Sequence, residues 1–139
     1  MMIKIQKENF QVDYEIEKIK SLSNEIGAVT NFIGYVRNIN NSKKVKSIYV
    51  EVYEEMAIKS LKKICENAKN KWNLIDYLVI HRFGNLSIND KIVLVSTFSK
   101  HRKESFESCN FIMDYLKKEA PFWKKENYEN ESKWLKNFN

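Results

Sequence analysis

Glycine and proline, the residues that most often interrupt regular structure, are rare in this sequence. Three glycines (Gly27, Gly34 and Gly84) and a single proline, Pro121, stand among 139 residues. We therefore expect long helices and strands joined by few loops. A chain of this length has the usual size of one domain with its own hydrophobic core, so we treat residues 1–139 as a single domain.

Hydrophobic periodicity predicts five strands and three helices. Runs rich in β-branched and aromatic residues predict strands over residues 2–6, 28–36, 47–53, 74–83 and 91–98. Apolar residues at helical spacing predict helices over 12–22, 55–72 and about 100–119, with Asp13 and Ser99 as N-caps and Pro121 limiting the last. A polar, mobile hairpin loop at 38–46 joins the strands at 28–36 and 47–53, and short polar turns join the strands at 74–83 and 91–98. This favours antiparallel hairpins in an α+β domain with two long helices.

The balance of charge limits the choice of partner. The net charge is +6, which points to an anionic partner or substrate; nucleic acid, a phosphorylated small molecule and an acidic protein all fit. No apolar run is long enough to span a bilayer, so we expect no membrane contact. The N-terminus lacks the apolar run of a signal peptide, which makes the cytoplasm the expected location.

Several kinds of catalytic or metal site are disfavoured. Cys65 and Cys109 fall among apolar residues of predicted helices, where a free cysteine is usually a small buried hydrophobe. The two histidines have no paired cysteines at metal-ligand spacing, so we expect no metal and no bound cofactor. The sequence also lacks a glycine-rich phosphate loop and a Gly-x-Ser-x-Gly elbow.

Basic residues at the ends of predicted elements are the remaining candidates. Arg37 follows the strand at 28–36, where its guanidinium can hold a phosphate through two hydrogen bonds. His101 and Arg102 lie in the first turn of the last helix, where backbone N–H groups favour an anion. Solvated residues at a helix start are the alternative, and for Arg102 the two interpretations are equally supported.

Lys117 and Lys124 flank an unusual turn, Ala120-Pro121-Phe122-Trp123. Lysines are common at helix C-termini because they complement the helix dipole. Here, however, large aromatic side chains separate the two lysines and can partly desolvate an ammonium group. Desolvation lowers a lysine pKa toward the range of acid–base or nucleophilic chemistry. Lysines mixed with aromatics can also stack and bind single-stranded nucleic acid, so a small nucleic-acid-binding domain is the main alternative.

Several of these segments, taken in order, resemble the MoaE family, the large subunits of molybdopterin synthase. The resemblance runs from about residue 27 to 126 and is most specific at its last segment, residues 111–117 with 120–126. The matching residues are Gly27-Ala28-Val29, Phe32, Gly34, Val36-Arg37-Asn38, Val50-Glu51, Tyr53, Met56, Ile80-His81-Arg82, Gly84, Ser99, His101-Arg102, Phe111-Ile112-Met113-Asp114-Tyr115-Leu116-Lys117 and Ala120-Pro121-Phe122-Trp123-Lys124-Lys125-Glu126.

The resemblance implies a hammerhead-type α+β fold and a sulfurtransferase activity. Members convert cyclic pyranopterin monophosphate (precursor Z) to molybdopterin by inserting two sulfurs, donated by the C-terminal thiocarboxylate of a small ubiquitin-like MoaD partner. A homodimer of large subunits with a small subunit at each end is the implied heterotetramer. Lys117 and Lys124 are the implied catalytic residues. The implied substrate-binding residues are Tyr35, Val36, Arg37, His101, Arg102, Lys117, Lys124, Lys125 and Glu126.

The sequence departs from this pattern at Tyr35, where some relatives carry a lysine, so one basic contact beside Arg37 is missing. Relatives also often extend past the position of Asn139, and Trp134, Leu135 and Phe138 are possible docking points in the polar tail. The sixteen residues from His101 to Lys117 span roughly 24 Å of straight helix, too far for one small pterin phosphate to contact both. We therefore predict a composite site, with Lys117 and Lys124 from one protomer and His101 and Arg102 from its dimer mate.

Overall fold

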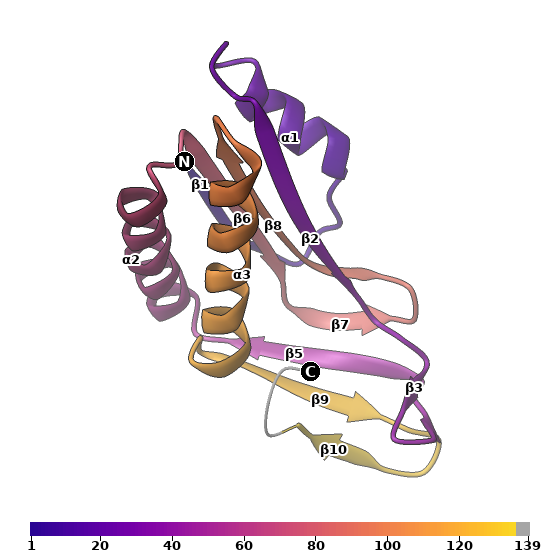
Figure 1. The fold of residues 1–139 in the computed structure, drawn as a ribbon. Coiled ribbons are helices and arrows are strands. Elements are labelled where there is room, and N and C mark those ends of the chain that lie inside the picture. Colours follow the sequence, from indigo (N-terminus) through magenta and orange to yellow (C-terminus); the bar gives the residue numbers. More distant parts are fainter. Residues whose placement is uncertain (136–139) are drawn as a thin grey trace.

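The computed structural model describes residues 1–135, which form two four-stranded sheets, a small hairpin and three helices (Figure 1). The first sheet has the strand order β1 (Met2–Gln6), β6 (Asp76–Arg82), β8 (Lys91–Ser99) and β2 (Ala28–Tyr35). β1 runs parallel to β6, whereas β6 with β8 and β8 with β2 are antiparallel. β2 is therefore an edge strand of the first sheet.

Helices cover both faces of the first sheet, and alternation along its strands divides the core. Tyr77 and Val79 of β6 face α2 (Glu54–Trp72) and α3 (Arg102–Lys118), which pack side by side. Leu78 and Ile80 face the opposite way, toward α1 (Val12–Lys20). Because successive side chains of a strand point to opposite faces, one apolar strand supplies both halves of the core.

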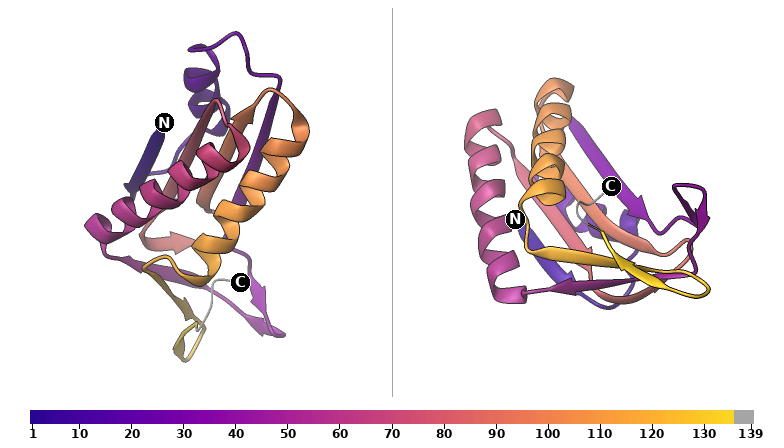
Figure 2. Two further views of the ribbon diagram at one scale, coloured as in Figure 1. Left: turned by 60° about the vertical axis from the view of Figure 1, so that its left-hand side comes forward. Right: turned by 90° about the horizontal axis from the view of Figure 1, so that it is seen from below.

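The second sheet crosses the ends of α2 and α3 (Figure 2). Its order is β10 (Ser132–Trp134), β9 (Phe122–Asn127), β5 (Ser47–Val52) and β7 (Gly84–Ser87), and all of its pairings are antiparallel. β3 (Ile39–Asn40) and β4 (Lys43–Lys44) form the small hairpin in the chain segment that joins β2 to β5. Its turn residues, Asn41 and Ser42, both have positive φ, as a tight hairpin turn requires.

The predicted elements are confirmed in type and place, but some of their connections are wrong. Residues 74–83 and 91–98 do pair as an antiparallel hairpin, with β7 inserted between them. The strands at 28–36 and 47–53 do not pair, because β2 pairs with β8 and β5 joins the second sheet. β9 and β10 lie where the sequence predicted only a turn and a polar tail.

The two predicted N-caps are also wrong. Gln11 and His101 occupy the cap positions of α1 and α3, and neither makes a capping hydrogen bond through its side chain. Asp13 lies inside the first turn of α1, where it still complements the helix dipole. The Ser99 hydroxyl instead donates to the carbonyl of His101 at 2.6 Å. No helix within residues 1–135 is long and apolar enough to cross a membrane.

Candidate active site

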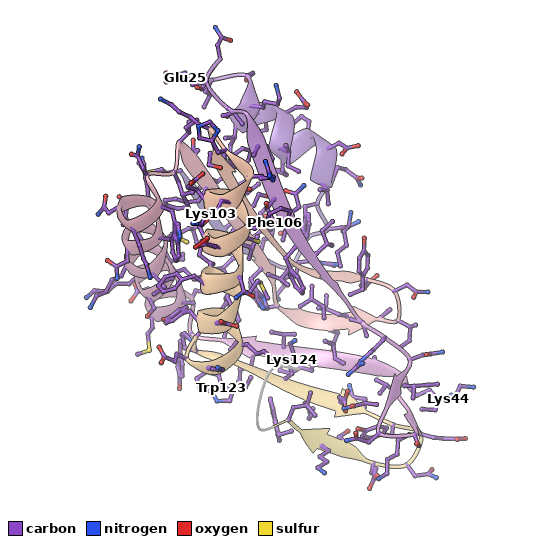
Figure 3. The ribbon with its side chains drawn as sticks, in the orientation of Figure 1. Glu25, Lys44, Lys103, Phe106, Trp123 and Lys124 are labelled. Carbon is purple, nitrogen blue, oxygen red and sulfur yellow. The ribbon has the colours of Figure 1, made fainter. Side chains whose placement is uncertain are left out.

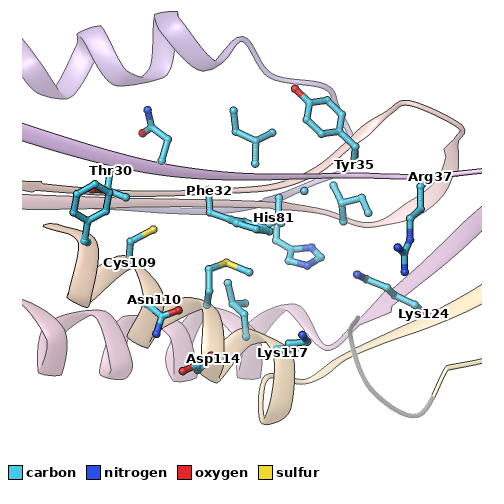
Figure 4. Close-up of a pocket in the computed structure, with 18 residues that line it drawn as sticks. Thr30, Phe32, Tyr35, Arg37, His81, Cys109, Asn110, Asp114, Lys117 and Lys124 are labelled. Atoms are coloured by element: carbon cyan, nitrogen blue, oxygen red, sulfur yellow. The ribbon is translucent and has the colours of Figure 1, made fainter. Parts of the chain in front are cut away.

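A cavity of about 670 Å³ lies between the edge strand β2 and helix α3 and ends at β9 (Figure 4). Residues 30–35 of β2 form one wall. Gly34 adds no side chain to this wall, and a Cβ at its position would crowd the Cγ1 of Val93 at 3.0 Å. α3 forms the other wall with Phe106, Cys109, Asn110, Met113, Asp114, Leu116 and Lys117. These positions recur every three or four residues, so they share one face of the helix.

Three basic side chains gather at the end of this cavity. Arg37 follows β2, Lys117 lies in the last turn of α3, and Lys124 projects from β9. The turn at Pro121 makes this possible, because it reverses the chain after α3 and lets β9 pair with β5, with Lys124 opposite Val50. Three cations facing one cavity strongly favour an anionic ligand.

Lys124 is half-buried, and its environment changes its acidity. Burial, above all, lowers its pKa from 10.5 to about 8; the charge of Glu126 opposes this, while Arg37 and Lys117 reinforce it. The burial of Lys124 agrees with the partly desolvated ammonium group that the sequence analysis expected beside the aromatic turn. At neutral pH such a lysine is mostly protonated but holds an appreciable fraction of free amine, as an acid–base group requires.

His81 also lines the cavity, although the sequence analysis gave it no role. Its side chain is buried, stacks on Phe122 with 3.9 Å between ring centroids, and places Nδ1 2.8 Å from the carbonyl oxygen of Arg82. Burial, reinforced by the charge of Lys124, lowers the pKa of His81 to about 3. The available signal in the sequence was a histidine directly after the apolar run Tyr77–Ile80 of a predicted strand.

A second cavity, of about 320 Å³, lies on the other side of the two lysines. Its wall is formed by residues 117–124 with Met56 of α2 and Leu135. Among residues 1–135, Lys117 and Lys124 are the only two that line both this cavity and the larger one. The two lysines therefore stand at the junction of two separate hollows, as a group acting between two ligands must.

The larger cavity brings together Tyr35, Arg37, Lys117 and Lys124 from the predicted set. The other predicted residues, Val36, His101, Arg102, Lys125 and Glu126, lie outside its lining. Val36 is buried in the core, and the Lys125 ammonium faces the rings of Tyr49 and Trp134 on the opposite face of β9. Glu126 is buried and accepts hydrogen bonds from Asn40 Nδ2 at 2.8 Å and from the Tyr128 hydroxyl.

His101 and Arg102 are exposed at the far end of α3 from Lys117. Figure 3 shows this separation: Lys103, next to Arg102 in the sequence, lies at one end of the helix, and Trp123 and Lys124 lie below the other. Within one protomer, His101 and Arg102 therefore lie far from Lys117 and Lys124, as the helix length predicted. That a second protomer brings the two groups together stays a prediction.

The aromatic residues of the turn point in different directions. Phe122 is buried against His81, whereas Trp123 is exposed and packs edge-on against Tyr53 with 5.7 Å between ring centroids. A surface that stacks bases needs accessible ring faces. The burial of Phe122 therefore counts against the nucleic-acid-binding alternative.

Neither cysteine has the properties of a nucleophile. Burial raises the pKa of Cys65 to about 12 and that of Cys109 to about 11. Cys109 lines the cavity but donates its thiol hydrogen toward the carbonyl of Val95. Within residues 1–135, no three His, Cys, Asp or Glu side chains come together as they do at a metal site.

Comparison with known proteins gives the family. The profile described as MoaE protein matches residues 5–119. The chain belongs to the MoaE protein family. This agrees with the resemblance carried by the ordered motifs between residues 27 and 126.

Two curated relatives within the MoaE family span nearly the whole chain. The molybdopterin synthase catalytic subunit of Ralstonia nicotianae is 47% identical over 133 residues, which cover 96% of this chain and 76% of the relative. The molybdopterin synthase catalytic subunit of Vibrio cholerae is 44% identical, with 96% and 88% of the two chains covered. Each match includes both lysine-bearing segments, because it leaves out so little of the chain.

Solved structures share the fold. The crystal structure of molybdopterin synthase from Staphylococcus aureus superimposes with a TM-score of 0.88 at 32% identity and covers 95% of each chain. A complex of subunits 1 and 2 of the molybdopterin-converting factor from Helicobacter pylori gives a TM-score of 0.80 at 21% identity, with 96% of this chain and 90% of that chain covered. The second likeness concerns the fold alone. The expected α+β fold is confirmed.

Proposed function

We propose that this chain is the catalytic subunit of a molybdopterin synthase and acts in molybdenum cofactor biosynthesis. The reaction is the conversion of cyclic pyranopterin monophosphate to molybdopterin by two sulfur transfers. In each transfer the thiocarboxylate sulfur forms a C–S bond to the pterin side chain as a C–O bond of that side chain breaks, and water then cleaves the acyl C–S bond, which leaves a carboxylate on the donor. The main support is the position of Lys117 and Lys124, which line both cavities and so can contact a substrate on one side and a sulfur donor on the other.

The larger cavity suits a phosphorylated pterin. Its basic end presents Arg37, Lys117 and Lys124 to the phosphate, and Phe32 and Met113 give an apolar wall for the ring system. Arg37 is exposed, so its guanidinium can reach a phosphate without losing a buried partner. Arg37→Ala should raise the KM for the pterin by roughly tenfold or more, the usual loss for a charge-assisted hydrogen bond.

The smaller cavity suits the narrow C-terminal tail of a small ubiquitin-like partner. A tail ending in glycines needs little width, and a cavity of about 320 Å³ holds a few such residues. The thiocarboxylate at its end would then meet the two ammonium groups, which attract its negative charge. The Helicobacter pylori protein is itself a complex of two subunits, so a chain of this fold can bind a second, different chain.

The two lysines can divide the chemistry. With a pKa of about 8, Lys124 both gives and takes protons near neutral pH, which suits it to proton transfer as sulfur adds to the substrate. Lys117 is more exposed and can stabilise the negative charge that develops on the donor carbonyl. The cysteines take no part, because the sulfur arrives on the partner.

A composite site would complete the phosphate-binding group with His101 and Arg102 of a second protomer. Mixing a Lys117→Ala protein with an Arg102→Ala protein tests this, since each mixed dimer would contain one intact site. Random exchange should then restore about a quarter of the wild-type activity, because half of the dimers are mixed and half of their sites are intact. Mixed dimers with no activity at all would contradict a shared site.

The proposed function is tested by adding thiocarboxylated partner and precursor Z to the purified chain and measuring the dithiolene product. Product formation that needs both additions is the expected result. Absence of product with a partner that binds the chain would contradict the proposal. Binding of single-stranded oligonucleotides with a steep salt dependence would favour the nucleic-acid-binding alternative instead.

A further inference from the structure

His81 is a polar residue in an otherwise apolar part of β6. The four residues before it, Tyr77–Ile80, are all buried hydrophobic side chains of the core. His81 itself is only 4% exposed, yet it borders the cavity that holds Lys124. Burying an imidazole in such a place is costly unless its nitrogens have partners.

The contact of Nδ1 fixes the chemical form of the ring. Nδ1 lies 2.8 Å from the carbonyl oxygen of Arg82, and a carbonyl oxygen can only accept a hydrogen bond. Nδ1 must therefore carry the hydrogen. Because burial and the charge of Lys124 lower the pKa of His81 to about 3, the ring stays neutral at physiological pH, and Nε2 keeps its lone pair.

Two further contacts fix where this lone pair lies. The ring of Phe122 stacks on the imidazole at 3.9 Å and 21° between the ring planes, which prevents the imidazole from turning. Phe122 is also two residues before Lys124 on β9, so the same strand carries both the stacking ring and the lysine. In Figure 4 the amino group of Lys124 points toward the imidazole of His81.

We propose that His81 is a positioning residue for Lys124: its Nε2 accepts a hydrogen bond from the lysine amino group and holds that group at the junction of the two cavities. This role rests on the proposed function, in which Lys124 transfers protons. It does not require His81 to touch the substrate. The imidazole would orient the lysine much as a buried carboxylate orients a catalytic histidine, but without adding a charge.

Neutrality is what makes a histidine suitable here. A carboxylate in its place would neutralise the cationic end of the cavity, and a protonated imidazole would repel the lysine. A neutral acceptor stabilises the ammonium form slightly and therefore raises the pKa of Lys124 against the effect of burial. The charges of Glu126, Arg37 and Lys117 act on Lys124, and Tyr35 and Asp114 are further titratable groups that line the same cavity.

Two substitutions separate this role from a purely structural one. Asparagine can replace Nδ1 as the donor to the Arg82 carbonyl, but it has no acceptor at the position of Nε2. Glutamine reaches the position of Nε2 with an acceptor oxygen but leaves the Arg82 carbonyl without its donor. A structural role predicts that His81→Asn is the milder change, whereas positioning of Lys124 predicts that His81→Gln is the milder one.

The measurement is the pH dependence of amine labelling at Lys124 in the isolated chain, read by mass spectrometry of the peptide that contains it. His81→Asn should move the midpoint toward lower pH by roughly half a pH unit or more, and His81→Gln should stay near wild type. An unchanged midpoint in His81→Asn, or an equal shift in both variants, overturns the proposal.

Nitrogen NMR of the wild-type chain gives a second test that needs no variant. At pH 7 we expect His81 to show a protonated Nδ1 and a lone-pair Nε2 that accepts a hydrogen bond. A protonated Nε2, or an imidazolium, would overturn the proposal. Neither measurement involves substrate or partner, so each can fail or succeed independently of the assay for molybdopterin.

Discussion

Replacing Lys124 with methionine should make the protein more stable while it abolishes sulfur transfer. Methionine keeps a long flexible stem in the half-buried position but removes the charge that burial disfavours. The pKa of Lys124 is about 8 in the folded chain against 10.5 for an ordinary lysine. At about 1.4 kcal/mol for each tenfold change in proton affinity, the charged lysine costs the folded state at most about 3 kcal/mol.

The sign and the pH range of this cost follow from the two pKa values. Between pH 8 and 10.5 the unfolded chain binds more protons at this lysine than the folded chain does, so stability rises with pH. The full cost is therefore present below pH 8 and is relieved above it. Solvent screens part of the charge of a half-buried group, so we expect Lys124→Met to gain about 1 to 3 kcal/mol at pH 7.

Urea unfolding at pH 7 and at pH 10 measures this difference. The advantage of Lys124→Met should shrink to less than about 1 kcal/mol at pH 10, where most of the wild-type lysine is neutral in the folded chain. Lys125→Met is the matched control: it removes a charge from the same strand, but on the face where the ammonium contacts Tyr49 and Trp134, and should lack the stabilisation. A Lys124→Met protein less stable than wild type at pH 7, or equally favoured at both pH values, would show that burial does not lower the pKa of Lys124.

Three further changes test other parts of the structure. Glu126→Gln removes the negative charge that opposes the lowered pKa of Lys124, so the midpoint of Lys124 labelling should move to lower pH, whereas an unchanged midpoint would exclude this pairing. Leu61→Ala opens a cavity in the fully buried core and should cost about 2 to 5 kcal/mol in urea unfolding; a loss below about 1 kcal/mol would mean that α2 packs loosely. The double change Cys65→Ala and Cys109→Ala should leave sulfur transfer within a few-fold of wild type in the dithiolene assay, since both thiols are buried and protonated, and its abolition in a folded variant would implicate a thiol.

The elements of the fold could be predicted because most of them are local. The helices over 54–72 and 102–118 and the apolar strands over 76–82 and 91–99 follow from periodicity within each segment. The pairing of strands could not be predicted in the same way, because β5 pairs with β7 and β9 rather than with β2, the strand expected as its partner. Nothing within residues 47–52 distinguishes these partners. The choice depends on how both sheets pack against the same helices.

β9 was missed for a specific reason. Its sequence, Phe122 to Asn127, is rich in lysine and polar residues and shows no alternation of apolar side chains. It is a strand because β5 and β10 pair with it on either side and because Phe122 and Glu126 are buried on one face. Tertiary pairing here outweighs local preference.

The candidate site was partly visible in the sequence. Arg37, Lys117 and Lys124 were singled out as basic residues at the ends of elements, and they meet in one cavity. The contribution of His81 could not be predicted, because it depends on the stacking of Phe122 and on the carbonyl of Arg82. The second cavity was also invisible, since it forms only where α2, the turn at Pro121 and Leu135 come together.

The decisive measurement is the single-turnover rate of dithiolene formation, with the concentrations of precursor Z and thiocarboxylated partner both above their dissociation constants. Lys124→Ala should lower this rate by at least about 100-fold, the usual contribution of a positioned acid–base group. Lys133→Ala, a basic residue on β10 outside both cavities, is the control and should react like wild type. A Lys124→Ala rate within a few-fold of wild type would contradict the claim that the two lysines contact both substrate and sulfur donor during the reaction.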